Sequence, residues 1–290
     1  MLGNSRQAGT SSRQSAGTEE ARTRSVRPRP VRWWRSRTFD VVQFVVLAGG
    51  LIWLTVRGAD AMGYNWQWYR MPQYFWRVID GELIWGPLMT GLTVTLELSA
   101  YSMILTILIG LVTALLRQSD SVSGEVLAKV YLEAIRNTPM LVQLLVFYFV
   151  ISPIIGIDRF WTGVLCLSVF EGAFASEIIR AGITSVPRGQ WEGAASIGLS
   201  RRQTYRDVIL PQAVPLMLPP MTGVLINLIK HSAIVSVIAV FDLTTEGRNV
   251  IADTFMSFEV WLTVAGMYLV ITCTLSVFVS YLERRVARKD

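Results

Sequence analysis

The sequence predicts an all-α protein that crosses a membrane about six times, with both termini on the cytoplasmic side. Three observations support this class: the composition, a set of apolar runs and the distribution of basic residues. Of 290 residues, 52% are apolar and only 17% are charged, whereas a soluble domain usually carries about a quarter charged residues. The composition therefore favours a polytopic membrane protein before any motif is considered.

Six runs are candidates for the helices of about 20 apolar residues that span a bilayer. The first and third runs are short for a span, and the fourth contains two glutamates. The six runs cover residues 41–56, 88–116, 140–155, 161–179, 216–240 and 260–282.

The basic residues predict the orientation, because cytoplasmic loops are enriched in Lys and Arg. With the N-terminus inside, 21 of the 27 Lys and Arg residues lie in cytoplasmic segments, five lie outside, and Lys230 falls within a span. Residues 1–40, rich in Ser, Gly, Arg and Pro, are expected to be a disordered cytoplasmic tail. Its arginines are read as a positive-inside flank, so no nucleic-acid partner is expected. Residues 41–87 are expected to hold the first span and an external aromatic segment, and 284–290 a second basic tail.

The polar stretch RGQWEGAASIGLSRRQTYRDVILPQA, residues 188–213, lies on the predicted cytoplasmic side. A helix can begin just after Pro187, and Gly198 suits the left-handed position that ends a helix. Ser200 and Gln203 have the spacing of a capping box, so a second helix should start there. We expect that helix to run to Pro211, where the chain turns back toward the membrane. The prediction is two short helices, separated by a tight turn, on the membrane surface.

The first of these helices has the composition of a docking element. Glu192 lies beside three small residues, Gly193, Ala194 and Ala195. Small residues let another surface approach closely, and the carboxylate can accept charge-assisted hydrogen bonds. Such a helix fits a groove in a partner protein.

This segment resembles the signature loop of the permease subunits of ABC importers. The matching residues are Glu192 to Ala195, Gly198, and the ending Val208 to Pro211; the match departs at Gly193, where the family usually has Ala. Three other stretches resemble the polar amino-acid uptake branch of that family, which includes histidine, glutamine, glutamate and arginine importers. They are Glu133–Phe149, Ser176–Glu192 and Leu218–Leu243, the last with an unusual His231. The resemblance covers roughly residues 88–283.

The resemblance implies a type I importer permease of MetI-like fold, with residues 88–283 as the permease core and 185–213 as its coupling loop. It implies a bacterial inner-membrane location and three kinds of partner: a cytoplasmic ATPase dimer, a second copy or a related permease, and an external amino-acid-binding protein. The residues expected to couple to the ATPase are Glu192, Gly193, Ala194, Ala195, Gly198 and Arg201. The chain has no GxxxxGK[ST] motif of its own, so no cofactor is expected in it, and Mg-ATP is expected in the partner ATPase.

Four polar residues within the spans are candidates for the substrate path. An ionised side chain at mid-bilayer costs about 2.5–3.5 kcal/mol, so each needs a reason to be there. Either Lys230 pairs with a carboxylate such as Glu171 and holds spans together, or Glu171, Asn227, Lys230 and His231 line a polar cavity. Glu171 is the leading cavity candidate. Glu177 and Arg180, three residues apart, are expected to pair structurally.

Other classes of function fit less well. An ion-coupled secondary amino-acid transporter is the main alternative, but no convincing internal repeat is visible. With one histidine and neither HExxH nor GxSxG, the sequence offers no catalytic residues and no metal site. Cys166 and Cys273 are expected to be free thiols. The expected function is a transport subunit rather than an enzyme.

Overall fold

The structure is a computed structural model, and it describes residues 37–61, 63–119 and 121–286. The chain divides into two compact units, residues 1–65 and 66–290. In the first unit, α1 (Arg37–Ala61) is a single helix whose apolar side chains are exposed and which is long enough to span a membrane. It begins four residues inside the predicted 1–40 tail. The rest of that tail and residues 287–290 lie outside the described residues.

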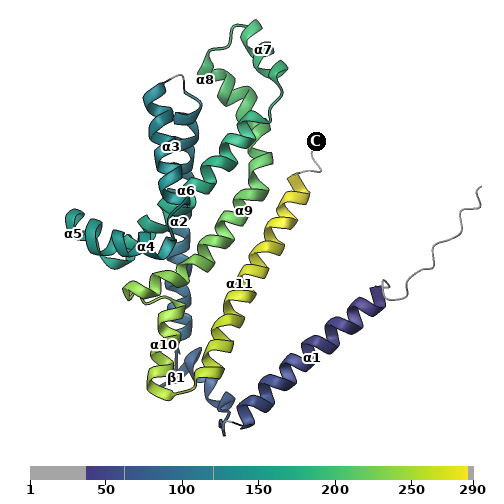
Figure 1. Ribbon diagram of the computed structural model, residues 1–290, viewed down its shortest axis with the longest axis vertical. Helices are drawn as coiled ribbons and strands as arrows, with labels where there is room; N and C mark the ends of the chain where they lie inside the picture. Colours follow the sequence, from purple (N-terminus) through teal and green to yellow (C-terminus); the bar gives the residue numbers. More distant parts are fainter. Residues whose placement is uncertain (1–36, 62, 120, 287–290) are drawn as a thin grey trace, which may run out of the picture. The chain divides into compact units, whose positions relative to one another are not determined.

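The second unit is built on three long helices that pack together (Figure 1). They are α2 (Pro87–Arg117), α6 (Arg159–Thr184) and α9 (Leu210–Val235), with α11 (Ser257–Val286) beside α9. Counting α1, the described residues contain five helices long and apolar enough to cross a membrane, or six if one bent pair is a single span. The predicted all-α, about six-span class is confirmed.

Apolar side chains form three successive layers along this bundle. The first surrounds Leu88 and Leu243, the middle one surrounds Leu98 and Leu228, and the last contains Ala114 with residues of α6 and α9. Figure 1 shows α10 (Leu243–Thr254) at one end of the unit and α7 (Arg188–Ser196) at the opposite end. The three apolar layers therefore follow one another from the end of the unit that carries α10 to the end that carries α7.

Close contact between α2 and α6 depends on small residues. A Cβ atom placed on Gly110 would lie 2.9 Å from Cβ of Ala175, so a larger residue would push the helices apart. Small residues and hydroxyl groups are what membrane helices use to pack, because apolar burial does not favour protein over lipid. Ser168 Oγ accordingly donates to the carbonyl oxygen of Ser102 across the interface, at 3.2 Å.

The third predicted span, residues 140–155, is helical throughout, but it lies at a sharp angle to the helix before it, which was not predicted. Residues 140–155 form α4 (Met140–Val146), a π-helical segment η3 (Phe147–Ile151) and α5 (Ser152–Ile155), and this arm is bent 109° from α3 (Val122–Arg136). Pro139 causes the break, since it lacks an N–H group and disfavours helix at the preceding residue. Gln143 Nε2 donates to the carbonyls of Ile135 and Thr138, at 2.8 and 3.0 Å, and so satisfies groups that the break leaves free.

The external aromatic segment is not helical throughout. A 3₁₀ helix, η2 (Trp68–Tyr74), leads into a hairpin of β1 (Trp76–Ile79) and β2 (Glu82–Trp85), which pair antiparallel. Asp80 and Gly81 turn the hairpin with φ of 53° and 83°, the backbone of a type I′ turn. This small sheet is a local departure from the all-α prediction.

A buried carboxylate organises the connection after α9, which passes through η5 (Ser236–Ile238). Asp242 is completely buried and caps α10 by accepting hydrogen bonds from the backbone N–H groups of Thr244 and Thr245. Burial raises the pKa of the Asp242 carboxyl, and the hydrogen bonds from Thr245 and Thr244 offset part of that rise.

Candidate functional site

The predicted cytoplasmic segment has the turn that its sequence indicates. α7 (Arg188–Ser196) starts directly after Pro187, and Gly198 follows it with φ of 76°. Ser200 and Gln203 make a reciprocal capping box at the start of α8 (Arg201–Gln203). The helix, the left-handed glycine and the second helix start are all confirmed, and Figure 1 shows this segment projecting from the end of the bundle.

The predicted turn at Pro211 is wrong. α8 continues through a π-helical segment, η4 (Thr204–Ile209), directly into α9, so residues 201–238 form one candidate span. Pro211 lies in the first turn of α9, where the missing N–H group costs little because the wider π turn precedes it. Because α8, η4 and α9 form one continuous helix, a displacement of α8 would also move the membrane-spanning helix α9.

The surface that α7 presents is small and weakly polar. Glu192, Gly193 and Ala195 are exposed, and no atom lies within 4 Å of the position of a Cβ on Gly193. Ala194 instead points inward and is 4% exposed. Ile197, which sequence reasoning missed, is 76% exposed and adds an apolar contact point. The inner side is held by Trp191 packing edge-on against Tyr205, with ring centroids 5.2 Å apart.

The remaining predicted coupling residues lie on the same segment. Arg201 is exposed at the first position of α8, and Gly198 is exposed in the turn. The structure therefore places five of the six predicted coupling residues on the solvent-exposed side of this projection.

Two of the predicted substrate-path residues form a pair in the middle of the bundle. Nδ1 of His231 on α9 lies 2.8 Å from Oε1 of Glu171 on α6, and the Glu171 side chain is almost completely buried. With an ionised carboxylate, Nδ1–H donates the bond, which leaves Nε2 for another partner. Glu171 is 12 residues from the start of α6, so the pair is about 18 Å from that end. Sequence reasoning did not predict this pair, since the two residues are 60 positions apart.

The structure does not pair Glu171 with Lys230. Lys230 is exposed on the surface of the chain, and no carboxylate among the described residues lies within ion-pair distance of it. Asn227, one turn away on α9, is partly exposed. A lysine facing lipid at this depth would cost about 2.5–3.5 kcal/mol, so this face of α9 requires water or another subunit beside it.

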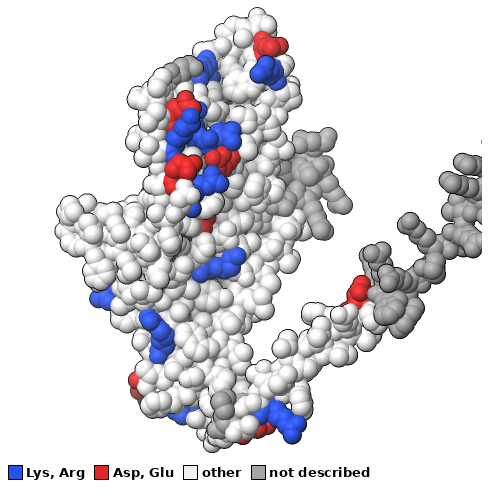
Figure 2. All heavy atoms as spheres, in the orientation of Figure 1, with Lys and Arg blue, Asp and Glu red and all other residues white. Residues whose placement is uncertain are grey.

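A second cluster of charge lies at the ends of α2, α3 and α6. Glu177 accepts from Arg117 and from Arg180, the latter at 3.0 Å, and Arg136 lies 3.5 Å away. Figure 2 shows acidic and basic side chains gathered over α3 and α6, while most of the surface around them is uncharged. The predicted Glu177–Arg180 pair is confirmed, and the structure adds the other two arginines.

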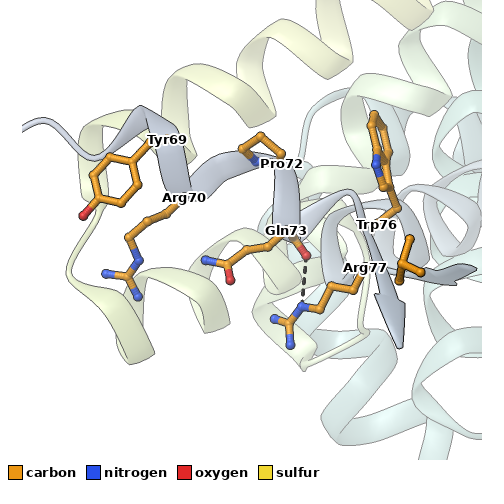
Figure 3. Close-up of a pocket in the computed structure, with 7 residues that line it drawn as sticks. Tyr69, Arg70, Pro72, Gln73, Trp76 and Arg77 are labelled. Atoms are coloured by element: carbon orange, nitrogen blue, oxygen red, sulfur yellow. Dashed lines mark hydrogen bonds between the residues drawn. The ribbon is translucent and has the colours of Figure 1, made fainter. Parts of the chain in front are cut away.

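The opposite end carries an exposed surface of arginines and aromatic rings. Residues of η2 and β1 line a hollow of about 740 Å³. Figure 3 shows Arg70 and Arg77 beside Tyr69 and Trp76, with Arg77 Nε donating to the carbonyl oxygen of Gln73 at 3.1 Å. Nearby, the backbone N–H of Gln67 donates to the buried carboxylate of Glu259 at 2.6 Å, which fixes this segment to α11.

Comparisons with known proteins agree with this architecture. Residues 106–288 match the family described as "Binding-protein-dependent transport system inner membrane component". The chain is 38% identical to the probable glutamine ABC transporter permease protein GlnM of Bacillus subtilis, over 69% of this chain and 93% of that one. It is 36% identical to the glutamine transport system permease protein GlnP of Escherichia coli K12, over 71% and 97%. It is 34% identical to the L-cystine transport system permease protein TcyB of B. subtilis, over 79% and 95%.

Solved structures give the same result. A crystal structure of an amino acid ABC transporter with histidines superposes with a TM-score of 0.63 at 38% identity, covering 69% of this chain and 94% of that chain. An inward-facing MetNI methionine ABC transporter, at 21% identity and a TM-score of 0.61, shares the fold and covers 69% and 96%. The chain therefore belongs to the family of inner-membrane components of binding-protein-dependent transport systems, as a multi-pass permease.

Proposed function

We propose that this permease is the membrane subunit of an ATP-driven importer of polar or charged amino acids. The observation that carries the proposal is the projecting segment from α7 to α8, which continues without a break into α9. The similarity to permeases named for glutamine and cystine supports the substrate class.

The energy source is a separate cytoplasmic ATPase dimer, which holds the Mg-ATP. Its groove receives the exposed side of α7, where Glu192 accepts hydrogen bonds and Gly193 and Ala195 allow close approach. Movement of α7 is transmitted through Trp191 and Tyr205 to α9. ATP must bind the two states of the complex differently, since otherwise it would shift no equilibrium.

The substrate path runs beside the exposed face of α9. His231 is the side chain that contacts the amino acid, and Glu171 positions its ring from behind. Nε2 of a neutral imidazole accepts a hydrogen bond from an ammonium group, and an imidazolium donates to a carboxylate. Lys230 and Asn227 share the neighbouring face, and Lys230 provides a cation for the substrate carboxylate.

Two further partners complete the proposal. A second copy or a related permease covers the face of α9 that carries Lys230, which keeps that lysine from lipid. An external amino-acid-binding protein docks on the surface formed by Arg70, Arg77, Tyr69 and Trp76 (Figure 3). Exposed arginine and aromatic residues are enriched at protein interfaces.

The test is uptake of a panel of labelled amino acids by liposomes containing the permease, its ATPase and its binding protein. We expect uptake of polar or charged amino acids that requires ATP inside and the binding protein outside. Uptake driven by a proton or sodium gradient without ATP would instead support an ion-coupled secondary transporter. The control is an ATPase variant that binds but does not hydrolyse ATP, which should abolish accumulation.

A further inference from the structure

A groove at the α7 end of the bundle lies beside the coupling segment and shares Arg201 and Tyr205 with it, and the proposed transport function assigns it no ligand. It has a volume of about 470 Å³ and lies where the end of α2 meets the segment from α8 to the start of α9. Its apolar lining comes from Leu111 and Leu115 of α2, Ile183 of α6, Tyr205 of η4 and Leu210 of α9. The interior is therefore apolar.

Three arginines line the same groove: Arg201, Arg202 and Arg206. All three are exposed. Among the described residues, the one carboxylate within ion-pair distance of Arg202 or Arg206 is that of Asp207, 3.7 Å from Arg206, and both side chains of that pair are largely exposed. An apolar groove with an excess of positive charge matches an amphipathic, anionic ligand.

The depth of the groove identifies the class of ligand. Leu111 is six residues before Arg117, the last residue of α2, so it lies about 9 Å further into the membrane. The groove thus begins among the hydrocarbon chains and ends at the level of the lipid headgroups. A soluble protein that docks on the cytoplasmic face cannot reach its floor, whereas an acyl chain already occupies that depth.

The chain's own N-terminal tail is a poor occupant. Residues 1–37 contain nine arginines and two glutamates. This tail is therefore positively charged, and the arginines of the groove would repel it. Basic pockets between membrane helices on the cytoplasmic side suit anionic lipid headgroups. We propose that this groove binds an anionic phospholipid of the inner leaflet, with an acyl chain against Leu111 and Leu115 and the phosphate on Arg202 and Arg206.

This site has a consequence for transport, because it lies on the segment that connects α7 to α9. A lipid that bridges α2 and the start of α9 stabilises the arrangement in which the two are close together. Anionic lipid therefore favours one position of the coupling segment, by mass action on the state that binds it.

The experiment uses the full-length permease in its complex, purified into bicelles that contain equal amounts of phosphatidylglycerol and phosphatidylcholine. Retained lipid is measured by native mass spectrometry. We expect phosphatidylglycerol to be retained in preference, and Arg202→Gln/Arg206→Gln to weaken its retention about 25-fold, at about fivefold for each arginine near an anionic headgroup. Leu115→Trp, which fills the groove, should also reduce retention.

Matched controls isolate the groove. Arg188→Gln removes an exposed arginine of α7 that does not line the groove, and Val112→Trp adds the same ring on another face of α2. Both should retain phosphatidylglycerol like the wild type. Soluble glycerol phosphate should not displace the lipid, because it has no chain to fill the groove.

Three results would each overturn the proposal. One is equal retention of the two lipids by the wild type, and another is unchanged phosphatidylglycerol retention in the double arginine variant. The third is capture of protein rather than lipid by a photo-crosslinker at position 115, which would assign the groove to a second copy or to another subunit. The two arginines are exposed, so the double variant should fold and keep the test decisive.

Discussion

Replacing Glu171 by glutamine tests the proposed substrate path most sharply. The carboxylate is 2% exposed and accepts the Nδ1–H bond of His231 at 2.8 Å. A glutamine keeps the shape of the side chain and still offers an oxygen to that donor. The change therefore removes the charge while it leaves the buried contact in place.

The size of the effect follows from the type of hydrogen bond. A bond to a charged group contributes about 1.5–3 kcal/mol, and a neutral one contributes about 0.5–1.5 kcal/mol. The difference of about 1 kcal/mol corresponds to a factor of about five in how strongly His231 is held in one orientation. We expect uptake per transporter to fall by up to about fivefold in Glu171→Gln, because the imidazole spends a smaller fraction of the time in the orientation that contacts the substrate.

The assay is uptake by reconstituted liposomes, normalised to the amount of permease, with the thermal stability of each variant measured in parallel. His231→Gln and the double variant complete a double-mutant cycle. If the two side chains act as a unit, the double variant should lose less than the sum of the single losses. Normal uptake per transporter in Glu171→Gln, with reduced abundance, would show that the pair only holds α6 and α9 together.

Three further predictions concern coupling, the charge cluster and the external end. Gly198→Pro or Glu192→Lys should abolish ATP-driven uptake at normal abundance in the membrane, and wild-type uptake in either variant would refute the coupling role. Glu177→Gln should destabilise the purified permease by about 2 kcal/mol, because the acceptor that three arginines share loses its charge. A thermal melt should separate it from Glu125→Gln, which removes only an exposed pair with Lys129 on α3 and should leave the melting temperature almost unchanged. Asp242 has a raised pKa in the folded chain, so its contribution to stability is present below its ordinary pKa and is lost as the pH rises through the folded value. Asp242→Asn, whose single amide oxygen can replace one of the two cap acceptors, should therefore gain stability relative to the wild type as the pH rises from acid to pH 7. A stability difference that is the same at both pH values would show that the pKa of this carboxyl does not change on folding.

Local rules predicted the coupling segment well. Gly198 has the left-handed backbone that its place after a helix indicates, and Ser200 with Gln203 forms the expected cap. These features depend on a few neighbouring residues, so the sequence contains the information. Hydropathy likewise located both ends of α2 to within one residue and both ends of α11 to within four residues. The predicted ends of α6 and α9 are each five residues from the observed ones, and the predicted start of α9 is six residues too late.

Where neighbouring rules conflict, the sequence was a weaker guide. A proline such as Pro211 usually ends a helix. Here the π-helical segment η4 precedes it, and the helix continues through Pro211 into α9. Pro139 lies just before the run that was predicted as the third span, and the sharp bend that it introduces between α3 and α4 cannot be read from hydropathy. The hairpin turn at Asp80 and Gly81 was hidden among aromatic residues that suggested an interfacial segment.

Contacts between distant residues were beyond reach. Glu171 and His231 are 60 positions apart, and which residue of α9 faces Glu171 depends on the rotation and depth of two helices. Lys230 directly precedes His231 in the sequence. It carries the opposite charge to Glu171, so charge alone favoured Lys230 as the partner of Glu171. The helical turn of about 100° between the two residues decides in favour of His231.

The most direct measurement of the central claim places a single cysteine at position 193 of α7, in a chain whose Cys166 and Cys273 have been replaced. In intact cells this cysteine should resist a membrane-impermeant maleimide, and in the assembled complex it should form a disulfide with a cysteine in the groove of the ATPase. Such a crosslink is expected to stop uptake until it is reduced. Labelling from outside the cell, or a crosslinked complex that still imports amino acids at the normal rate, would contradict the claim that the ATPase drives transport through this segment.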